Sequence, residues 1–213
     1  MKHIGKLHVI TDFSFQQKYS HADLAKMAIQ GGADTIQFRQ KIGPIRDLLF
    51  NAARVREVCS EADVTFLVND RIDLALAVEA DGVHLGQSDM PIDRARAILG
   101  EKAIIGATTP SVKLAEQAHR QGADYVGFGP IFPTKSKANP TKVVGLDGLQ
   151  AFCAEISLPV IAIAGITPWN AHDVIEQGAH GIAVMSAVTL SDSPVSTTEL
   201  FAKTLQHHPS GKV

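Results

Sequence analysis

The chain has 213 residues, 45% of them hydrophobic, and its 20 basic and 22 acidic residues leave a formal net charge of -2. This length suits one domain with a substantial core, and the near-neutral charge excludes a broad surface for nucleic acid or for an anionic membrane. No apolar run approaches the ~20 residues that a membrane-spanning helix needs. The N-terminus has no signal-peptide pattern and neither cysteine has a CxxC partner. We therefore expect a cytoplasmic protein with reduced thiols.

Short apolar segments alternate with amphipathic segments along the whole chain, in the manner of strands and helices. In chain order the predicted strands are 7–11, 35–39, 65–69, 82–86, 103–107, 125–129, 160–164 and 181–185. The strands must be parallel, because each connection is long enough to hold a helix. Eight repeats predict an α/β fold, a single-domain (β/α)8 TIM barrel over 1–213 with a frayed tail at 207–213. A doubly wound open sheet is the alternative.

Local signals mark the ends of several predicted helices. A Gly-Ala-Asp tripeptide or a close variant precedes four strands, which indicates a repeated turn with glycine after the helix. The four variants are Gly32-Ala33-Asp34, Ala80-Asp81-Gly82, Gly122-Ala123-Asp124 and Gly178-Ala179-His180. Helix starts are predicted at Thr167-Pro168, where a cap precedes a proline, and at the capping box of residues 196–199.

Two neighbouring strands are each followed by an aspartate. Asp70 follows the third predicted strand and Asp89 follows the fourth. In parallel sheets, ligands gather at the carboxyl ends of the strands. Mg²⁺ typically takes one or two protein carboxylates and completes its coordination with water and phosphate oxygens. The pair therefore predicts a Mg²⁺ site, and helix capping by each aspartate is the alternative.

Long polar side chains alternate along the end of the second strand. Gln37, Arg39 and Lys41 share one face of that strand, because side chains two residues apart point the same way. Burying them without partners would be costly. We expect them to project into the mouth of the barrel and to hold an anion, with a solvated edge as the alternative.

Loops with the composition of phosphate sites follow later strands. Gly127 and Gly129 leave space beside the backbone, and the segment after them offers hydroxyl and ammonium groups. Barrels often bind phosphate on the loops after strands 7 and 8, where Gly165 would permit close approach, and a plain tight turn is the alternative. At the end of the fifth strand Thr108 could offer its hydroxyl to a ligand. We interpret His84, which shares a face with Gly82 and Gly86, as a hydrogen-bonded interior histidine rather than a base.

Six short motifs occur in this order along the chain: Gln37-x-Arg39-x-Lys41, Asn69-Asp70, Gly86-Gln87-x-Asp89, Pro133-Thr134-x-Ser136-Lys137, Ala164-Gly165-Ile166 and Val184-Met185-Ser186. In this order and spacing they resemble the thiamine phosphate synthase family over essentially the whole chain. The resemblance implies a transferase that couples 4-amino-2-methyl-5-hydroxymethylpyrimidine diphosphate with 4-methyl-5-(2-phosphoethyl)thiazole, giving thiamine phosphate and diphosphate. Whether the thiazole carries a 2-carboxyl group is left open.

The resemblance also implies a role for each matching residue. The pyrimidine diphosphate would be held by Gln37, Phe38, Arg39, Gln40, Lys41, Asn69, Thr108 and Lys137. The thiazole phosphate would be held by Thr134, Lys135, Ser136, Gly165, Met185 and Ser186. Mg²⁺ would be the cofactor, bound by Asp70 and Asp89, and the catalytic set would be Arg39, Lys41, Thr108 and Lys137. The chain departs from the family at Ala164, where a second glycine is usual.

The chemistry of such a coupling agrees with the residues present. An aminopyrimidine can support positive charge on its exocyclic methylene carbon, so the reaction needs stabilisation of the leaving diphosphate more than it needs a base or nucleophile. Three alternatives stay open: a thiazole tautomerase of the same family, a non-catalytic barrel that binds phosphate ligands, and a phosphosugar epimerase. We expect small-molecule substrates and no nucleic-acid or membrane partner, and whether the chain forms a homo-oligomer is left open.

Overall fold

The structure is a computed structural model that describes residues 3–13, 16–134 and 142–206. The strands are β1 (Leu7–Asp12), β2 (Thr35–Arg39), β3 (Thr65–Asn69), β4 (Gly82–Leu85), β5 (Ile104–Thr108), β6 (Tyr125–Phe128), β7 (Val160–Ile163) and β8 (Gly181–Val184). They form a closed barrel in chain order, and β8 pairs in parallel with β1. The predicted (β/α)8 barrel is confirmed, and the open-sheet alternative is wrong.

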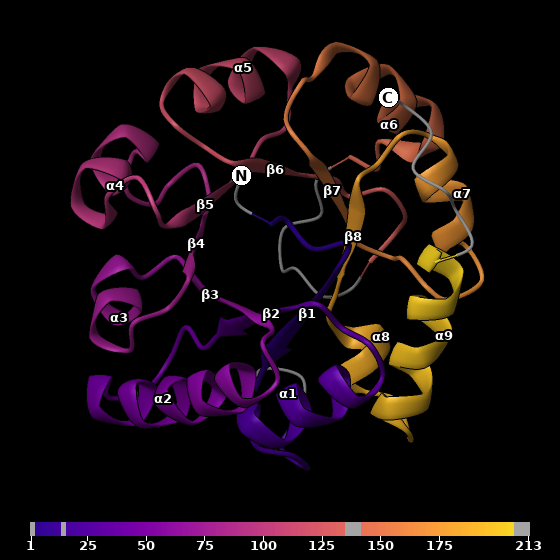
Figure 1. Ribbon diagram of the computed structural model, residues 1–213. Helices are drawn as coiled ribbons and strands as arrows, with labels where there is room; N and C mark the ends of the chain where they lie inside the picture. The colour runs from indigo at the N-terminus through magenta and orange to yellow at the C-terminus, as the bar shows by residue number, and fades with distance from the viewer. Residues whose placement is uncertain (1–2, 14–15, 135–141, 207–213) are drawn as a thin grey trace.

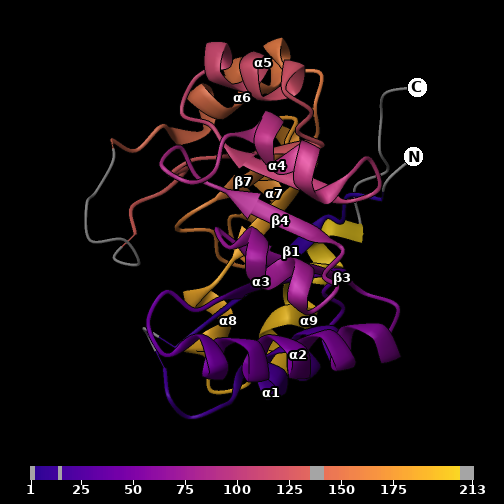
Figure 2. The ribbon, with the colours of Figure 1, turned by 90° about the vertical axis from the view of Figure 1, so that its left-hand side faces the viewer.

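Helices surround the barrel on all sides (Figure 1). They are α1 (His21–Gln30), α2 (Ile45–Glu61), α3 (Ile72–Ala77), α4 (Ile92–Leu99), α5 (Val112–Arg120), α6 (Gly145–Glu155), α7 (Ala171–Glu176), α8 (Ser186–Thr189) and α9 (Pro194–Gln206). In the side view, α3 and α4 lie in front of the strands (Figure 2). The short helix α8 directly after β8 was not predicted. Within the described part of the chain, no helix is long and apolar enough to cross a membrane.

The strand residues alternate between two cores, as the two-residue period of a strand requires. One core fills the barrel and consists of Ile10, Leu67, Ile104, Tyr125, Ile161 and Ala183. The other lies between the strands and the helices and includes Val9, Ile36, Phe66, Val83 and Val126. Residues at the carboxyl ends of the strands that continue the inward-facing set therefore line the mouth.

The repeated Asp turns fix the amino ends of the strands. Asp34 accepts a hydrogen bond from the Leu7 N–H at 3.0 Å, Asp81 from the Phe66 N–H at 2.8 Å, and Asp124 from the Ile105 N–H at 2.7 Å. Each carboxylate thus joins the start of one strand to the start of the next. In the fourth repeat, His180 Nε2 lies 2.8 Å from the Ile4 carbonyl oxygen and joins β8 to the start of the chain.

Glycines with a left-handed backbone precede three of these turns, as predicted. Gly32, Gly122 and Gly178 have φ of 95°, 97° and 94°, and Glu79 occupies the equivalent position before Asp81 with φ of 51°. The left-handed conformation lets the chain leave the helix and turn into the next strand.

One of the two predicted helix starts is wrong. At the other, the first turn begins at Thr167 as predicted: its carbonyl oxygen accepts the Ala171 N–H at 3.0 Å, its N–H donates to the Asn170 side-chain oxygen at 2.8 Å, and the regular helix α7 continues from Ala171. Helix α9 begins at Pro194, so residues 196–199 lie inside it. There the Thr198 hydroxyl donates to the Pro194 carbonyl oxygen at 2.7 Å instead of forming part of a cap. Inside α9 this local hydrogen bond satisfies the hydroxyl.

Candidate active site

The cationic side chains of β2 meet carboxylates at the mouth of the barrel. Arg39, the last residue of β2, forms an ion pair with Asp12, the last residue of β1. The Asp12 side chain is almost fully buried. Lys41 Nζ lies 2.9 Å from Asp70 Oδ2, which follows β3. Arg39 and Lys41 thus project toward the mouth as predicted, and both are held there by acids from neighbouring strands.

Asp70 and Asp89 lie side by side. Asp70 has a left-handed backbone with φ of 65°, and its N–H donates to the His84 carbonyl oxygen at 2.9 Å. Asp89 Oδ2 accepts the Gly86 N–H at 2.6 Å. Burial, together with a hydrogen bond to Asp70 and the charge of that neighbour, raises the pKa of Asp89. Two neighbouring carboxylates repel each other unless a proton or a cation lies between them.

This donor set fits a hard divalent cation. Mg²⁺ accepts two carboxylates and leaves its other positions to water and phosphate oxygens. Among the described residues, no group of three or more His, Cys, Asp or Glu is placed to hold a metal ion. The capping alternative is wrong, because the residue before α3 is Arg71 and the residue before α4 is Pro91.

The structure turns the side chain of one predicted substrate ligand away from the mouth and holds that of another in the loop after β2. Phe38 points outward from the barrel and packs against the His21 ring, with the ring centroids 4.5 Å apart. Its side chain cannot reach a ligand at the mouth, because it alternates with Gln37 and Arg39. The Gln40 side chain is bonded to Asn51 of α2 and to the Ile42 carbonyl oxygen, so it holds the β2–α2 loop.

Three further predicted residues lie at or below the mouth. Gln37 is buried inside the barrel, opposite Ile10 and Leu67 on the neighbouring strands. Asn69 ends β3 beside His84. Thr108 ends β5 and is partly exposed.

Thr108 is held by two side chains of the β4 segment. His84 Nε2 lies 2.8 Å from Thr108 Oγ1, and the Gln87 side-chain amide donates to the Thr108 carbonyl oxygen at 2.6 Å. On its other side, His84 Nδ1 lies 2.9 Å from the Tyr125 hydroxyl. Burial lowers the pKa of His84 to about 4, so the ring is neutral at pH 7. The prediction of a hydrogen-bonded interior histidine agrees with these contacts.

The predicted thiazole phosphate residues are only partly described. Lys135 and Ser136 lie outside the described residues, as does Lys137 of the pyrimidine diphosphate set, whereas Thr134 is the last residue before that gap. Gly165 has φ of 67°, and a Cβ there would lie 2.6 Å from Phe132 Cβ and 2.7 Å from the Pro133 carbonyl oxygen. The loop after β7 therefore packs directly against the segment that leads to Thr134.

Ala164 and the start of α8 complete this side of the mouth. Ala164 has φ of 83°, a conformation that favours glycine, so the departure from the family pattern strains the backbone. Met185 is the residue before α8 and Ser186 is its first residue. The structure thus places Gly165, Met185 and Ser186 after neighbouring strands β7 and β8.

Sequence reasoning missed Asp12 and Tyr125. Asp12 continues the inward-facing set of His8 and Ile10, and Tyr125 continues that of Gly127 and Gly129. The two-residue alternation of inward-facing side chains could have identified both residues, but neither belongs to a recognisable sequence motif.

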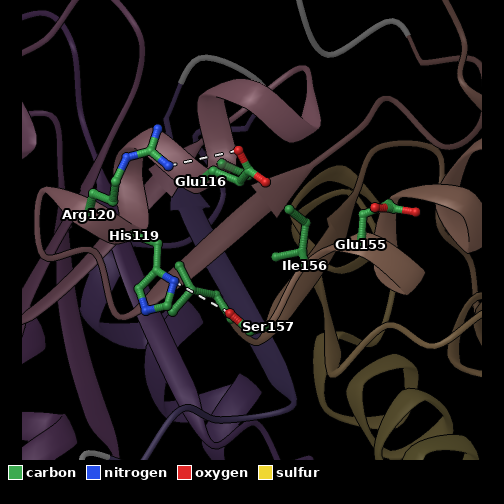
Figure 3. Close-up of a pocket in the computed structure, with 8 residues that line it drawn as sticks. Glu116, His119, Arg120, Glu155, Ile156 and Ser157 are labelled. Atoms are coloured by element: carbon green, nitrogen blue, oxygen red, sulfur yellow. Dashed lines mark hydrogen bonds and ion pairs between the residues drawn. The ribbon is translucent and has the colours of Figure 1, made fainter.

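A pocket of about 230 Å³ lies elsewhere, between α5 and the segment from α6 to β7 (Figure 3). It is lined by Glu116, His119, Arg120, Glu155, Ile156 and Ser157, among others. The carboxyl ends of α5 and α6 lead into the amino ends of β6 and β7, so this pocket is at the opposite end of the barrel from the mouth. In barrels of this class, that end contributes to stability rather than to chemistry.

Comparison with known proteins decides the family. A family model described as thiamine monophosphate synthase matches residues 7–188. The chain belongs to this family. The thiamine-phosphate synthase of Salinibacter ruber is 54% identical over 200 residues, which cover 94% of this chain and 88% of that protein. The corresponding protein of Methanocella arvoryzae is 46% identical over 207 residues, which cover 97% of this chain and 98% of that protein.

A solved structure agrees with the fold. The thiamine phosphate pyrophosphorylase of Pyrococcus furiosus is 40% identical and superposes with a TM-score of 0.86 over 94% of this chain and 95% of its own. Membership of the thiamine monophosphate synthase family makes this chain an enzyme, a transferase of thiamine biosynthesis.

Proposed function

We propose that the enzyme couples 4-amino-2-methyl-5-hydroxymethylpyrimidine diphosphate with 4-methyl-5-(2-phosphoethyl)thiazole, or with its 2-carboxy form, at the mouth of the barrel. The observation that carries this proposal is the cluster of charges at the mouth, where Arg39 is paired with Asp12, Lys41 is paired with Asp70, and Asp89 lies beside Asp70. Cations and a divalent-ion site side by side suit a diphosphate, which carries several negative charges.

The reaction breaks the bond between the methylene carbon and the diphosphate oxygen, and the electron pair leaves with the diphosphate. The lone pair of the thiazole nitrogen then forms the C–N bond to the same carbon. When bound by Asp70 and Asp89, Mg²⁺ would supply positive charge to the diphosphate oxygens. Arg39, held in place by Asp12, and Lys41 would stabilise the same charge as it grows on the leaving group. The Thr108 hydroxyl would contact this substrate from β5.

The thiazole phosphate would lie on the other side of the mouth. The loops after β6, β7 and β8 would supply Thr134, Gly165 and Ser186, and backbone N–H groups of such loops suit phosphate oxygens. Lys135 and Ser136 belong to the same proposed set through the family motif, whereas Lys137 of that motif would contact the leaving diphosphate of the other substrate. Two substrates on opposite sides would place the thiazole nitrogen opposite the methylene carbon.

The test is an assay with purified enzyme, both substrates and Mg²⁺, followed by mass measurement of the product. We expect thiamine phosphate only when all three are present. Arg39→Gln should lower turnover, whereas the matched control Arg46→Gln, on the exposed surface of α2, should not. Conversion of the thiazole phosphate without the pyrimidine diphosphate would instead establish the tautomerase. Binding of either phosphate compound without turnover would establish a non-catalytic barrel.

We further propose a cytoplasmic location. Both cysteines are free, Cys59 in the core and Cys153 partly buried. Burial raises the pKa of Cys59 to about 12 and that of Cys153 to about 11, so both thiols are unreactive at neutral pH. Unpaired thiols support a reducing compartment.

A further inference from the structure

A chain of polar side chains runs through the barrel interior to the mouth. The Tyr125 hydroxyl lies 2.9 Å from His84 Nδ1, and His84 Nε2 lies 2.8 Å from the Thr108 hydroxyl. Tyr125 is fully buried, His84 is partly buried, and Thr108 is partly exposed at the mouth. The chain therefore begins in the core and ends where a ligand can reach it.

Two glycines leave the space that this chain needs. A Cβ at position 106 would lie 2.1 Å from Cζ of the Tyr125 ring, and one at position 127 would lie 3.0 Å from Cε1 of the His84 ring. Gly106 and Gly127 sit on the strands β5 and β6 that also carry Thr108 and Tyr125. The interior of the barrel is thus shaped around the two rings.

The hydrogen atoms in this chain have a defined direction. Among the described residues, the Tyr125 hydroxyl has one hydrogen-bond partner, His84 Nδ1. Burial raises the pKa of Tyr125, so the hydroxyl keeps its proton and must donate it to Nδ1 to avoid an unpaired buried donor. A neutral imidazole that accepts at Nδ1 carries its own proton at Nε2. His84 therefore donates to Thr108 Oγ1.

We propose that Tyr125 and His84 are positioning residues that turn the Thr108 hydroxyl outward as a hydrogen-bond donor for the pyrimidine diphosphate. Because Thr108 Oγ1 accepts from His84, its own O–H is directed away from the ring, toward the mouth. Gln87, bonded to the Thr108 carbonyl oxygen at 2.6 Å, fixes the backbone from the same side. The site then selects a substrate that offers an acceptor atom at this point. The inference rests on the proposed function for the identity of that substrate.

The first experiment reads the proton position without any substrate. Protein labelled with ¹⁵N in its histidines gives long-range ¹H–¹⁵N spectra that distinguish the two neutral tautomers. We expect the His84 ring to carry its proton at Nε2, and to become a mixture of tautomers in Tyr125→Phe. A proton at Nδ1 in the parent protein would overturn the proposed direction. This measurement does not depend on the reaction. It therefore distinguishes failure of the proposed hydrogen-bond chain from failure of the proposed function.

The second experiment is a double-mutant cycle on the coupling reaction. Thr108→Val should lower kcat/KM for the pyrimidine diphosphate by about 10²–10³, as loss of one directed donor does. Tyr125→Phe alone should lower kcat/KM by about five- to tenfold. When Thr108→Val is already present, adding Tyr125→Phe should cause no further loss. The KM for the thiazole phosphate should stay unchanged in all three variants. Equal losses from Tyr125→Phe in both backgrounds would show a purely structural role and overturn the proposal.

Thr109 offers a matched control. It is the next residue along the chain, is buried, and its hydroxyl has no hydrogen-bond partner among the described residues. Thr109→Val makes the same chemical change as Thr108→Val and should leave kcat/KM unchanged. His84→Gln places an amide donor near the former Nε2 and should retain more activity than Thr108→Val. If Thr109→Val lost as much activity as Thr108→Val, the loss would reflect packing at this corner and not the direction of one hydroxyl.

Discussion

The two ends of the barrel both carry aspartates, but the carboxylates face different partners. At the amino ends of the strands, Asp34, Asp81 and Asp124 accept hydrogen bonds from backbone N–H groups. Asp81 and Asp124 are also paired with Arg56 and Arg96, at 3.0 Å and 2.7 Å. These acceptor oxygens are satisfied by the fold itself, so we assign them to stability.

At the carboxyl ends the carboxylates are satisfied differently. Asp12 is paired with Arg39 and Asp70 with Lys41, which are side chains that a phosphate ligand could also engage. Asp89 lies against Asp70, and burial, followed by the hydrogen bond and charge of Asp70, raises the pKa of Asp89. The same residue type thus completes the sheet at one end and leaves charge to be balanced by a ligand at the other. Sequence alone shows an aspartate in both cases.

The largest expected effect breaks the mouth without touching the opposite end. Asp70→Asn and Asp89→Asn keep the shape of the side chain but remove the charge that retains a hard cation. Each should lower kcat/KM by about 10²–10³ and should leave the free energy of unfolding within ~0.5 kcal/mol of the parent. Kinetics against Mg²⁺ concentration, together with denaturant unfolding, measure both quantities.

Further observations sharpen this prediction. High Mg²⁺, or Mn²⁺, should partly restore both variants, and the double variant should lose less than the product of the single losses because both residues would act on one ion. Full activity of Asp89→Asn at low Mg²⁺ would contradict the shared-ion proposal.

The opposite end should show the reverse pattern. Asp124→Ala removes the acceptor of the Ile105 N–H and leaves Arg96 without its carboxylate. We expect a loss of about 2–3 kcal/mol in the free energy of unfolding with kcat unchanged. The matched control is Asp93→Ala on α4, where the carboxylate is more than half exposed and 3.9 Å from Arg94. That change should cost less than ~0.5 kcal/mol. A large loss of kcat in Asp124→Ala would show that the two ends are coupled.

Two buried histidines, His8 on β1 and His21 on α1, should make stability depend on pH. Burial lowers the pKa of His8 to about 3 and that of His21 to about 4, below the ordinary value of 6.5. Below pH 6.5 the unfolded chain takes up protons that the folded protein does not, so stability is complete above pH 6.5 and falls as pH drops toward 4. Each histidine contributes up to about 1.4 kcal/mol per pH unit. Unfolding curves between pH 7 and 5 measure the slope.

A histidine variant isolates one contribution to that slope. His8→Gln removes one titrating group. The slope of unfolding free energy against pH should therefore fall by the contribution of one proton, up to about 1.4 kcal/mol per pH unit. Equal stability of the parent at pH 7 and pH 5 would contradict the assignment of neutral buried histidines.

The smallest effect concerns the strained backbone of the loop after β7. Ala164→Gly relieves a φ of 83° and should stabilise the folded protein by about 0.5–1 kcal/mol, after allowance for the greater freedom of glycine in the unfolded chain. Gly165→Ala, at the next position, should destabilise, because its Cβ would collide with Phe132 and Pro133. Thermal unfolding measures both. A loss of stability in Ala164→Gly would mean that the methyl group packs more favourably than the strain costs.

The sequence by itself determined the barrel and the position of each strand. These follow from local information: the alternation of apolar segments, connections long enough to force parallel pairing, and the turn tripeptides before the strands. The family follows separately, from the order and spacing of six short motifs. The sequence also predicted that Arg39, Lys41, Asp70 and Asp89 would meet at the mouth, because all four come at or just after carboxyl ends of adjacent strands.

Only the tertiary structure decided which side chains pair there. Arg39 with Asp12 and His84 with Tyr125 are contacts between residues 27 and 41 positions apart in the chain. These pairings depend on the closure of the barrel and on strand register, and neither an ion pair nor a hydrogen bond between distant residues leaves a pattern in the sequence. The same holds for Phe38, which sits between Gln37 and Arg39 but faces α1, and for the start of α9, where the Thr198 hydroxyl bonds to the Pro194 carbonyl oxygen. Sequence fixes which residues reach an end of the barrel, whereas packing fixes which way each one turns and what it touches.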